Sequence, residues 1–397
     1  MHVVIAGGGI AGLATAIAVH RAGHATTVLE RRETAEEAGS WLQVASEGMA
    51  ALDALGLGDA ASRLGEATPW VRIHAADGRR LADLPLGPPA GARHVTLSVR
   101  RAELHALLRA EASRVGVRTV HAAAVTGLEQ DARGATLVSA SGERHTGDLA
   151  VGADGVGSAV RAGLGIGGRA ADDRPGLVYV GGTARAGALP ASRAAPSGTL
   201  EFRFGRDCFV ACASLQDGTV GWFANPRVPA PRRGRTPVVP AAPEDWARLL
   251  LRLVGRDELP LAHLVAATPE IGVRVQRREA PPAWGSGRVA LVGDAAHAIS
   301  PASGQGAYLA LEDAAVLGRL LAEGADPDGV VARLALRRHA RVVSVIRQGE
   351  GLDRIKHLGP VGSVLRDRVV IPLAARRPAP DGTDAGTVTG MRDPARS

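Results

Sequence analysis

The 397-residue sequence predicts an α/β protein in which a parallel sheet is interleaved with a mostly antiparallel sheet and followed by C-terminal helices. Two stretches, residues 3–30 and 287–321, each contain an apolar strand, a glycine-rich turn and a helical run of small residues. Between them, residues 173–225 form short apolar runs separated by Gly, Ala and Pro loops, which is typical of antiparallel strands. A chain of this length that is 46% apolar can bury a large core and favours two joined domains.

The first stretch contains the glycine pattern of a dinucleotide-binding turn. Gly7, Gly9 and Gly12 follow the strand at residues 3–5 with G-x-G-x-x-G spacing. The first glycine permits the turn, the second lets a pyrophosphate approach the backbone, and the third lets helix and strand pack closely. Glu30 ends the next strand, where a carboxylate can accept hydrogen bonds from ribose hydroxyls. The sequence therefore predicts a Rossmann-like dinucleotide site, with an ordinary glycine-rich turn as the alternative.

The elements that follow alternate between helix and strand. A helix is expected over residues 47–55, a hairpin with an Asp-Gly turn over 71–84, a strand over 94–99 and a helix over 101–114. Arg31 stands in the loop directly after the second strand. It either contacts the phosphate side of the adenosine or is a solvated loop residue.

Two later strands end in aspartate. The segment DLAVGADG ends an apolar strand in Asp154 and Gly155, and Arg161 follows on the next helical turn. The segment RVALVGD ends another buried strand in Asp294, and a helical run covers residues 304–321. Because ligands of open α/β sheets lie at the carboxyl ends of the strands, we expect both aspartates at the site. Each aspartate could instead only cap the turn that follows it.

Aromatic residues gather in the stretch that predicts antiparallel strands. Strand alternation puts Phe202 and Phe204 on one face, and Trp222 lies in a neighbouring strand. We expect these three side chains to wall an apolar substrate pocket, although each taken alone is more typical of plain core. The alanine-rich segment 183–189 and the scarcity of polar residues nearby predict a roomy pocket rather than one fitted to a small carboxylate.

The composition argues against several other classes. The net charge of +7 comes from scattered arginines, without the pattern of bases and aromatics that nucleic-acid binding favours. Cys208 and Cys212 are the only cysteines and cannot form a disulfide framework, and without clustered His they predict no metal site. No long apolar run predicts a membrane span, and a strand that starts at residue 3 leaves no room for a signal peptide, so we expect a cytoplasmic protein.

Three features occur in a fixed order: the glycine pattern with Glu30, the Asp-Gly strand end at 154 and 155, and the segment VGDAAH before a helix. Together they resemble the single-component, group A FAD-dependent aromatic monooxygenases, the p-hydroxybenzoate hydroxylase-like family. The resemblance extends from residue 3 to about residue 345. It implies FAD as the cofactor and NADPH or NADH as a transient co-substrate, in agreement with the lack of a second G-x-G-x-x-G pattern in the sequence.

The resemblance assigns roles to the matching positions. Together with Arg31, the expected cofactor-binding residues are Gly7, Gly9, Gly12, Glu30, Arg101, Asp154, Gly155, Asp294, Gly306, Ala307 and Tyr308. Pro301, Gly304, Gln305 and Gly306 match the PxxGQG segment that lies along the flavin ring. Asp294 is expected to accept hydrogen bonds from ribityl hydroxyls. Asn is common in the family where this chain has Tyr308, so the tyrosine is expected to narrow the cavity or alter flavin movement, with backbone N–H groups still available.

The resemblance also implies the reaction. NAD(P)H would reduce the flavin, O2 would add at C4a, and the hydroperoxide would hydroxylate an aromatic or polycyclic small molecule, as in secondary metabolism. No catalytic side chain is required because the flavin carries the oxidant. Epoxidation, Baeyer–Villiger-type insertion and oxidative rearrangement on the same fold stay open. So does a flavin dehydrogenase or an escort protein without oxygen chemistry.

The order of the elements predicts the division of the chain. Residues 1–70, 95–172 and 275–325 are expected to form a discontinuous FAD-binding domain. Residues 71–94 and 173–274 are expected to form the substrate domain. A helical region over 326–375 and a flexible tail over 376–397 follow. The sequence leaves open the substrate, the choice between NADH and NADPH, and the oligomeric state.

Overall fold

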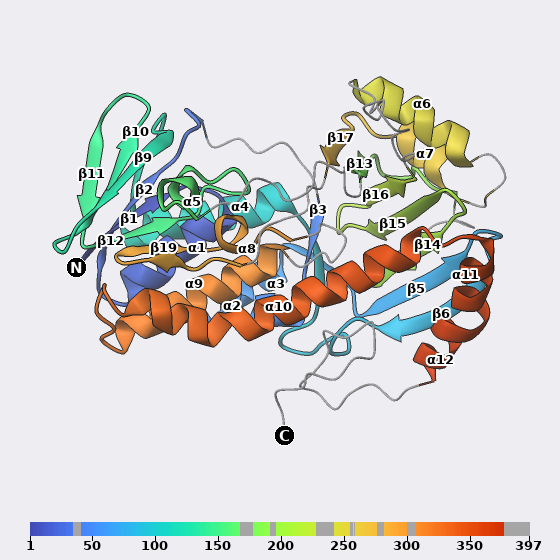
Figure 1. The fold of residues 1–397 in the computed structure, drawn as a ribbon. Helices are drawn as coiled ribbons and strands as arrows, with labels where there is room; N and C mark the ends of the chain where they lie inside the picture. Colours follow the sequence, from blue (N-terminus) through green and yellow to red (C-terminus); the bar gives the residue numbers. More distant parts are fainter. Residues whose placement is uncertain are drawn as a thin grey trace.

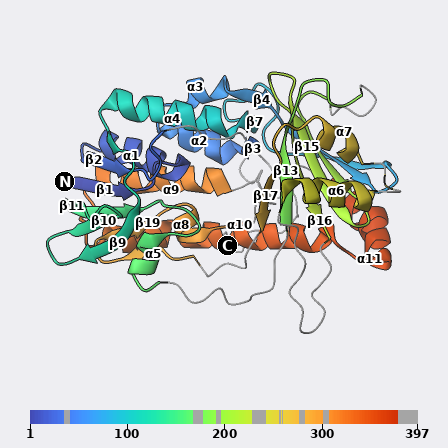
Figure 2. The same ribbon diagram turned by 90° about the horizontal axis from the view of Figure 1, so that it is seen from above.

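The computed structural model describes residues 1–34, 41–166, 178–190, 196–227, 242–254, 257, 259–275, 282–299 and 306–376. The candidate site lies among three parts of the fold: a parallel sheet with its helices, a seven-stranded sheet and a small sheet between them. Figure 2 shows the parallel sheet at one end of the molecule and the seven-stranded sheet at the other. The predicted α/β class with a second, mostly antiparallel sheet is confirmed.

The parallel sheet is built around its first strand. Its strand order is β18 (Gly285–Ser286), β19 (Val289–Leu291), β12 (Leu149–Gly152), β1 (His2–Ala6), β2 (Ala25–Leu29) and β8 (Arg118–Val120). All pairs are parallel except β18 with β19. The central strands are rich in Val, Ile and Leu and are buried on both faces, as covered parallel strands require.

Helices cover one face of this sheet. The helix α1 (Ile10–Arg21) follows the glycine turn and packs between α9 (Gly306–Ala322) and α4 (Arg101–Val115). Small residues allow the closest of these contacts, because a Cβ on Gly318 of α9 would lie only 2.6 Å from the Ala18 side chain of α1. The other face packs against α5 (Ala159–Gly163) and a hairpin sheet of β9 (Val125–Gln130), β10 (Ala135–Ser139) and β11 (Arg144–Gly147).

The seven-stranded sheet has two differently covered faces. Its order is β17 (Gly272–Val275), β13 (Val178–Ala184), β16 (Val220–Pro226), β15 (Cys208–Ser214), β14 (Thr199–Phe204), β5 (Trp70–Ala75) and β6 (Arg80–Pro85), antiparallel except for β14 with β5. One face packs against α6 (Pro243–Val254) and α7 (Leu261–Ala266). Cys208 and Cys212 lie on this face as free, fully buried residues of β15, so their expected role as strand core is confirmed.

The long helix α10 (Val330–Lys356) connects the two ends of the molecule. It runs from beside α9 to the second face of the seven-stranded sheet (Figure 1). There it continues into α11 (Pro360–Leu365), a π-helical turn (Arg366–Val370) and α12 (Ile371–Ala375). Within the described residues, no helix is long and apolar enough to cross a membrane.

A small sheet joins the two larger ones. It consists of β3 (Trp41–Val44), β7 (Leu97–Arg100) and β4 (Gly65–Ala67), beside α2 (Ser46–Ala54) and α3 (Gly58–Ser62). Arg100 at the end of β7 pairs with Asp217 and donates a 3.0 Å hydrogen bond to Thr219, next to β16. Trp41 stacks on Phe223 of β16, with ring centroids 6.4 Å apart. The short helix α8 (Asp294–His297) completes the described elements.

Candidate cofactor site

The three predicted glycines have three different environments. Gly7 has φ +100°, which L side chains rarely adopt, and its N–H donates to Leu29 at 2.8 Å. A Cβ on Gly12 would lie 1.8 Å from the Gly7 carbonyl oxygen, so only glycine lets α1 approach the strand end. Gly9 is the N-cap of α1, and no atom lies within 4 Å of its Cβ position. The open space at the start of α1 therefore lies above Gly9.

Glu30 lies against this turn. Its Oε2 accepts a 2.7 Å hydrogen bond from the N–H of Gly8, and its Oε1 accepts one of 2.9 Å from the N–H of Arg32. A small, partly open pocket surrounds the carboxylate, lined by Gly8, Leu13, Glu30, Arg32, Thr34, His105, Arg109, Thr119 and His121. One acid among several bases suits a ligand that carries both hydroxyls and phosphates. This is the geometry expected for the adenosine end of a dinucleotide.

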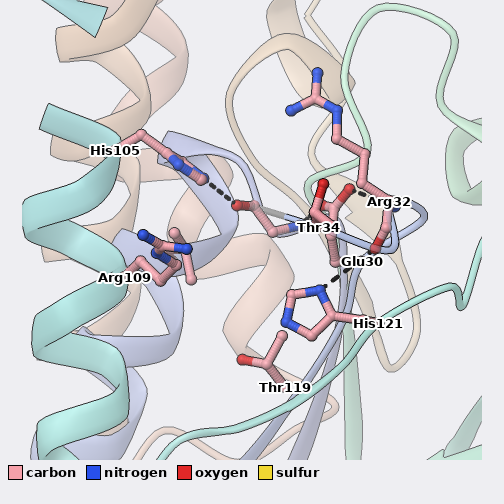
Figure 3. A pocket seen from close by; sticks show the side chains of 9 residues that line it. Glu30, Arg32, Thr34, His105, Arg109, Thr119 and His121 are labelled. Atoms are coloured by element: carbon pink, nitrogen blue, oxygen red, sulfur yellow. Dashed lines mark hydrogen bonds between the residues drawn. The ribbon is translucent and has the colours of Figure 1, made fainter. Parts of the chain in front are cut away.

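Several pocket residues were not predicted. Figure 3 shows His105 and Arg109 extending from α4 on one side of Glu30, with His121 below it. His105 Nε2 lies 2.7 Å from the Gly8 carbonyl oxygen. The sequence contains a signal for two of them, since Arg101, His105 and Arg109 recur every four residues and thus share one face of α4.

The loop residue Arg31 does not line the pocket. Its side chain is exposed, whereas the neighbouring Arg32 belongs to the pocket wall. Arg101 is half-buried at the first position of α4, directly after Arg100. Their predicted contacts with the phosphates remain predictions.

Asp154 caps a helix. Its carboxylate accepts hydrogen bonds from the Ser158 hydroxyl at 2.5 Å and from the N–H groups of Ala159 and Val160 at 2.8 and 3.2 Å. The capping alternative noted from the sequence is therefore present in the structure. The end of β12 still lies against the glycine turn, because a Cβ on Gly7 would lie 2.5 Å from the Ala153 carbonyl oxygen. Gly155 follows with φ +84°.

Arg161 connects the two aspartate motifs. Its Nη1 donates to the carbonyl oxygens of Ala295 and Ala296 at 3.3 and 3.2 Å. Both carbonyls belong to α8, the short helix that begins with Asp294. The segments around Asp154 and Asp294 are thus held side by side at the carboxyl ends of β12 and β19.

Asp294 faces the start of α9. Its side chain is half-buried, and no hydrogen bond or ion pair reaches its carboxylate from the part of the chain that the structure describes. Its Oδ1 lies 3.8 Å from the Cβ position of Gly306, the first residue of α9. A carboxylate beside a helix start can accept hydroxyl hydrogen bonds from a ligand whose anionic part meets the helix N–H groups.

The flavin-side segment is only partly described. Pro301, Gly304 and Gln305 lie outside the described residues. Gly306 and Ala307 begin α9 and are half-buried.

Tyr308 packs into the core. Its side chain is 2% exposed, and a Cβ on Gly48 of α2 would lie 2.5 Å from the Tyr308 Cβ. Burial raises the pKa of Tyr308 far above its usual value, and the Arg341 guanidinium lies 6.0 Å from the ring centroid. The ring thus lies between α2 and α10, and its expected effect on the cavity or on flavin movement stays a prediction. The backbone N–H remains at the start of α9.

The three aromatic residues predicted to wall one pocket do not share a face. Phe202 and Phe204 pack edge-on against Phe209, at centroid distances of 5.3 and 5.0 Å, on the face that α12 covers. Trp222 lies on the opposite face, where its Nε1 donates to the Thr268 hydroxyl at 2.8 Å beside Trp246. At the junction of the two sheets the half-buried aromatic residues are instead Trp41 and Phe223.

The only lysine of the sequence lies behind these aromatic rings. Lys356 ends α10, is 1% exposed, and donates to Asn225 Oδ1 at 2.9 Å and Asp353 Oδ1 at 3.1 Å. Its Nζ lies 4.7 Å from the Phe209 ring centroid and 5.8 Å from that of Phe223. Burial lowers the pKa of Lys356 to about 8. Sequence reasoning missed this residue because nothing near it in the chain predicts burial.

Metal chemistry has no structural support in the described residues. They contain no group of three or more His, Cys, Asp and Glu side chains that could hold a metal ion. The groups at the site are instead hydroxyl acceptors, bases and helix N-termini, which suit an organic phosphate cofactor such as FAD.

Comparison with known proteins identifies the family. Residues 1–348 match the family model described as FAD binding domain. The aurachin C monooxygenase/isomerase of Stigmatella aurantiaca is 30% identical over 90% of both chains. The 3-amino-4-hydroxybenzoate 2-monooxygenase PtmB3 of Streptomyces platensis is 34% identical over 94% of this chain and 93% of the relative. The structure of Klebsiella pneumoniae HpxO complexed with FAD and uric acid superposes with a TM-score of 0.78 at 25% identity, covering 92% of this chain and 90% of that one.

These similarities confirm three predictions made from the motifs: the family resemblance, the fold and FAD as the cofactor. They extend over nearly the whole chain and its relatives rather than over the glycine turn alone. The chain belongs to the FAD binding domain family, among its FAD-dependent monooxygenases.

Proposed function

We propose that this monooxygenase uses NADPH or NADH and O2 to hydroxylate an aromatic or polycyclic small molecule. The observation that carries the proposal is the aromatic wall formed by the half-buried Trp41 and Phe223, whose ring centroids are 6.4 Å apart. The buried ring of Tyr179 lies 5.7 Å from that of Phe223 and supports the wall. Trp41 begins β3, which contacts both β16 and α9. A flat substrate stacked on this wall would lie near the start of α9, where the flavin ring is expected.

The chain's own residues would bind and orient the cofactor. Glu30 would accept hydrogen bonds from the adenosine ribose, and the start of α1 at Gly9 would receive the pyrophosphate. Asp294 would accept hydrogen bonds from ribityl hydroxyls, and the first N–H groups of α9 would face the ring edge. Bound FAD supplies the redox chemistry that joins oxidation of the reduced nicotinamide to oxygen insertion.

The names of relatives support an aromatic substrate. They include a 3-amino-4-hydroxybenzoate 2-monooxygenase, and a 3-hydroxybenzoate 6-hydroxylase of Polaromonas naphthalenivorans that is 28% identical over 92% of this chain and 91% of the relative. HpxO forms a complex with FAD and uric acid, and uric acid is a fused-ring compound. We keep the roomy apolar pocket predicted from the sequence as part of the proposal, so a fused-ring substrate should be preferred over a single-ring carboxylate.

Isotope incorporation tests the proposal. The FAD-loaded protein is incubated with NADPH or NADH, ¹⁸O₂ and a panel that includes 3-hydroxybenzoate and 4-quinolones. The expected result is one ¹⁸O atom in the product, and faster product formation from the fused-ring compounds. Equal product formation without oxygen, with an artificial electron acceptor in its place, would instead identify a dehydrogenase. A clear preference for 3-hydroxybenzoate would overturn the roomy pocket.

A further inference from the structure

A buried carboxylate holds the loop that carries Asp294. Asp313 lies in α9 and is 0% exposed. Its Oδ2 accepts hydrogen bonds from the N–H of Gly293 at 3.0 Å and from Nε2 of His297 at 2.5 Å. These two donors stand directly before Asp294 and at the last position of α8. One carboxylate oxygen therefore binds both ends of the segment in which Asp294 lies.

The loop has little freedom of its own. Gly293 has φ +58°, and a Cβ there would lie 2.9 Å from the Ala11 side chain and 3.2 Å from that of Ala310. The backbone thus passes between α1 and α9 at a point where only glycine fits. Because α8 has four residues, its own hydrogen bonds cannot fix it strongly, and the Asp313 contacts supply the missing constraint.

The second oxygen of Asp313 connects the loop to α10. Its Oδ1 accepts a 2.8 Å hydrogen bond from Arg338 Nε, and Arg338 also pairs with Glu312. Burial alone would raise the pKa of Asp313, but His297 and Arg338 outweigh it and lower that pKa to about 2. Burial would likewise lower the pKa of His297, yet Asp313 raises it. Asp313 is therefore ionised at neutral pH, and its carboxylate favours the charged form of His297.

We propose that Asp313 and His297 are positioning residues for FAD, which fix the Gly293–Asp294 backbone in its binding geometry before the cofactor arrives. Asp294 alone would touch the ribityl chain; Asp313 and His297 act through the loop. A preorganised loop binds FAD without an entropic cost for ordering the loop. Loosening the loop should therefore lower the affinity for FAD and not only the stability of the fold.

Two variants test the proposal through FAD titration of the apoprotein, without substrate or oxygen. A titration that contradicts the positioning role would therefore leave the proposed oxygenase activity untouched, and the reverse also holds. His297→Gln and Asp313→Asn should each raise the Kd for FAD at least tenfold and alter the absorption band shape of the bound flavin. The Kd of the double variant for FAD should be no more than about threefold above the higher of the two single-variant Kd values, because both residues act through one loop.

The chain offers a matched control. Glu201 in β14 is also a buried carboxylate with an arginine and a histidine partner: Arg203 Nε donates to it at 2.9 Å, and His74 Nε2 lies 3.5 Å away. Glu201→Gln should lower the thermal midpoint but leave the Kd for FAD within threefold of the parent. Equal weakening of FAD binding by Glu201→Gln, or parental binding by His297→Gln, would overturn the proposal.

Removal of a buried charge can prevent folding, so the unmodified apoprotein provides a second measurement. Hydrogen exchange of a peptide that spans residues 289–299 should already be slow in the folded apoprotein, because the Gly293 N–H is bonded to Asp313. It should be faster in His297→Gln. Rapid exchange in the parent apoprotein would show that FAD itself orders the loop and would overturn the proposal.

Discussion

The Glu30 carboxylate spans the glycine turn: Oε2 accepts a 2.7 Å hydrogen bond from the N–H of Gly8, and Oε1 accepts one of 2.9 Å from the N–H of Arg32. Each carboxylate oxygen can accept two hydrogen bonds. One lone pair on each oxygen can therefore accept a further hydrogen bond, as the proposed contact with the ribose hydroxyls requires. Glu30 thus fixes the loop and could still bind the cofactor as proposed.

Replacing this carboxylate should weaken the binding of FAD. Glu30→Gln would place an amide group opposite one of the two backbone donors and remove the charge that strengthens both bonds. A hydrogen bond to a charged group contributes about 1.5–3 kcal/mol, so the Kd for FAD should rise about 10- to 100-fold. Fluorescence titration of the apoprotein measures it. Glu143→Gln, in the exposed turn before β11, is the control and should bind FAD like the parent; parental binding by Glu30→Gln would contradict the assignment.

The glycines permit a sharper comparison. Gly9→Ala should fold normally, since the φ of Gly9 is −76° and no atom lies within 4 Å of the new Cβ. The methyl group would nevertheless occupy the space above the helix start and raise the Kd for FAD at least tenfold. Gly12→Ala should lower the thermal midpoint strongly, because its Cβ would lie 1.8 Å from the Gly7 carbonyl oxygen.

Thermal unfolding and FAD titration of both apoproteins separate the two effects. A Gly9→Ala protein with both parental stability and parental FAD affinity would remove Gly9 from the pyrophosphate site. A Gly12→Ala protein that unfolds at the parental temperature would contradict the close packing of α1 on the strand end.

The buried lysine should make stability depend on pH in a defined window. Burial lowers the pKa of Lys356 from 10.5 to about 8. Between about pH 8 and 10.5 the unfolded chain therefore binds more protons than the folded one, and this residue's contribution to stability rises with pH. Below pH 8 the buried ammonium costs about 3 kcal/mol relative to the neutral amine.

Comparison with Lys356→Met isolates this contribution. Urea unfolding of both proteins at pH 7 and pH 10 should show the parent gaining at least about 2 kcal/mol relative to the variant. Cys208 and Cys212, whose pKa values burial raises, titrate in both proteins, so their effect cancels in the difference. A difference that stays constant with pH would mean that Lys356 is not buried as a charged group.

Local patterns predicted most of the fold. The strand, turn and helix over residues 3–30 follow from spacing within one stretch, and the observed β1, α1 and β2 agree with it. Alternation correctly put Phe202 and Phe204 on one face. It could not assign Trp222, because which face of the sheet meets α6 and which meets α12 depends on distant parts of the chain. The domain boundaries remain predictions.

The supporting residues of the site were beyond sequence reasoning for the same reason. Asp313 is a single acid in an apolar helix, and only folding brings it to His297 and Arg338. Lys356 stands 131 residues from Asn225, its partner in space. Arg109 is the exception, since its spacing from Arg101 puts both on one face of α4, a signal that the sequence prediction did not use.

The measurement that tests the central claim most directly is the visible spectrum of the purified protein with added FAD. It is recorded without oxygen before and after NADPH or NADH, with a panel of aromatic compounds present, and again after air is admitted. The account predicts bound-flavin bands that bleach with the reductant and return in air together with a hydroxylated product. A protein that binds no FAD under these conditions would contradict it.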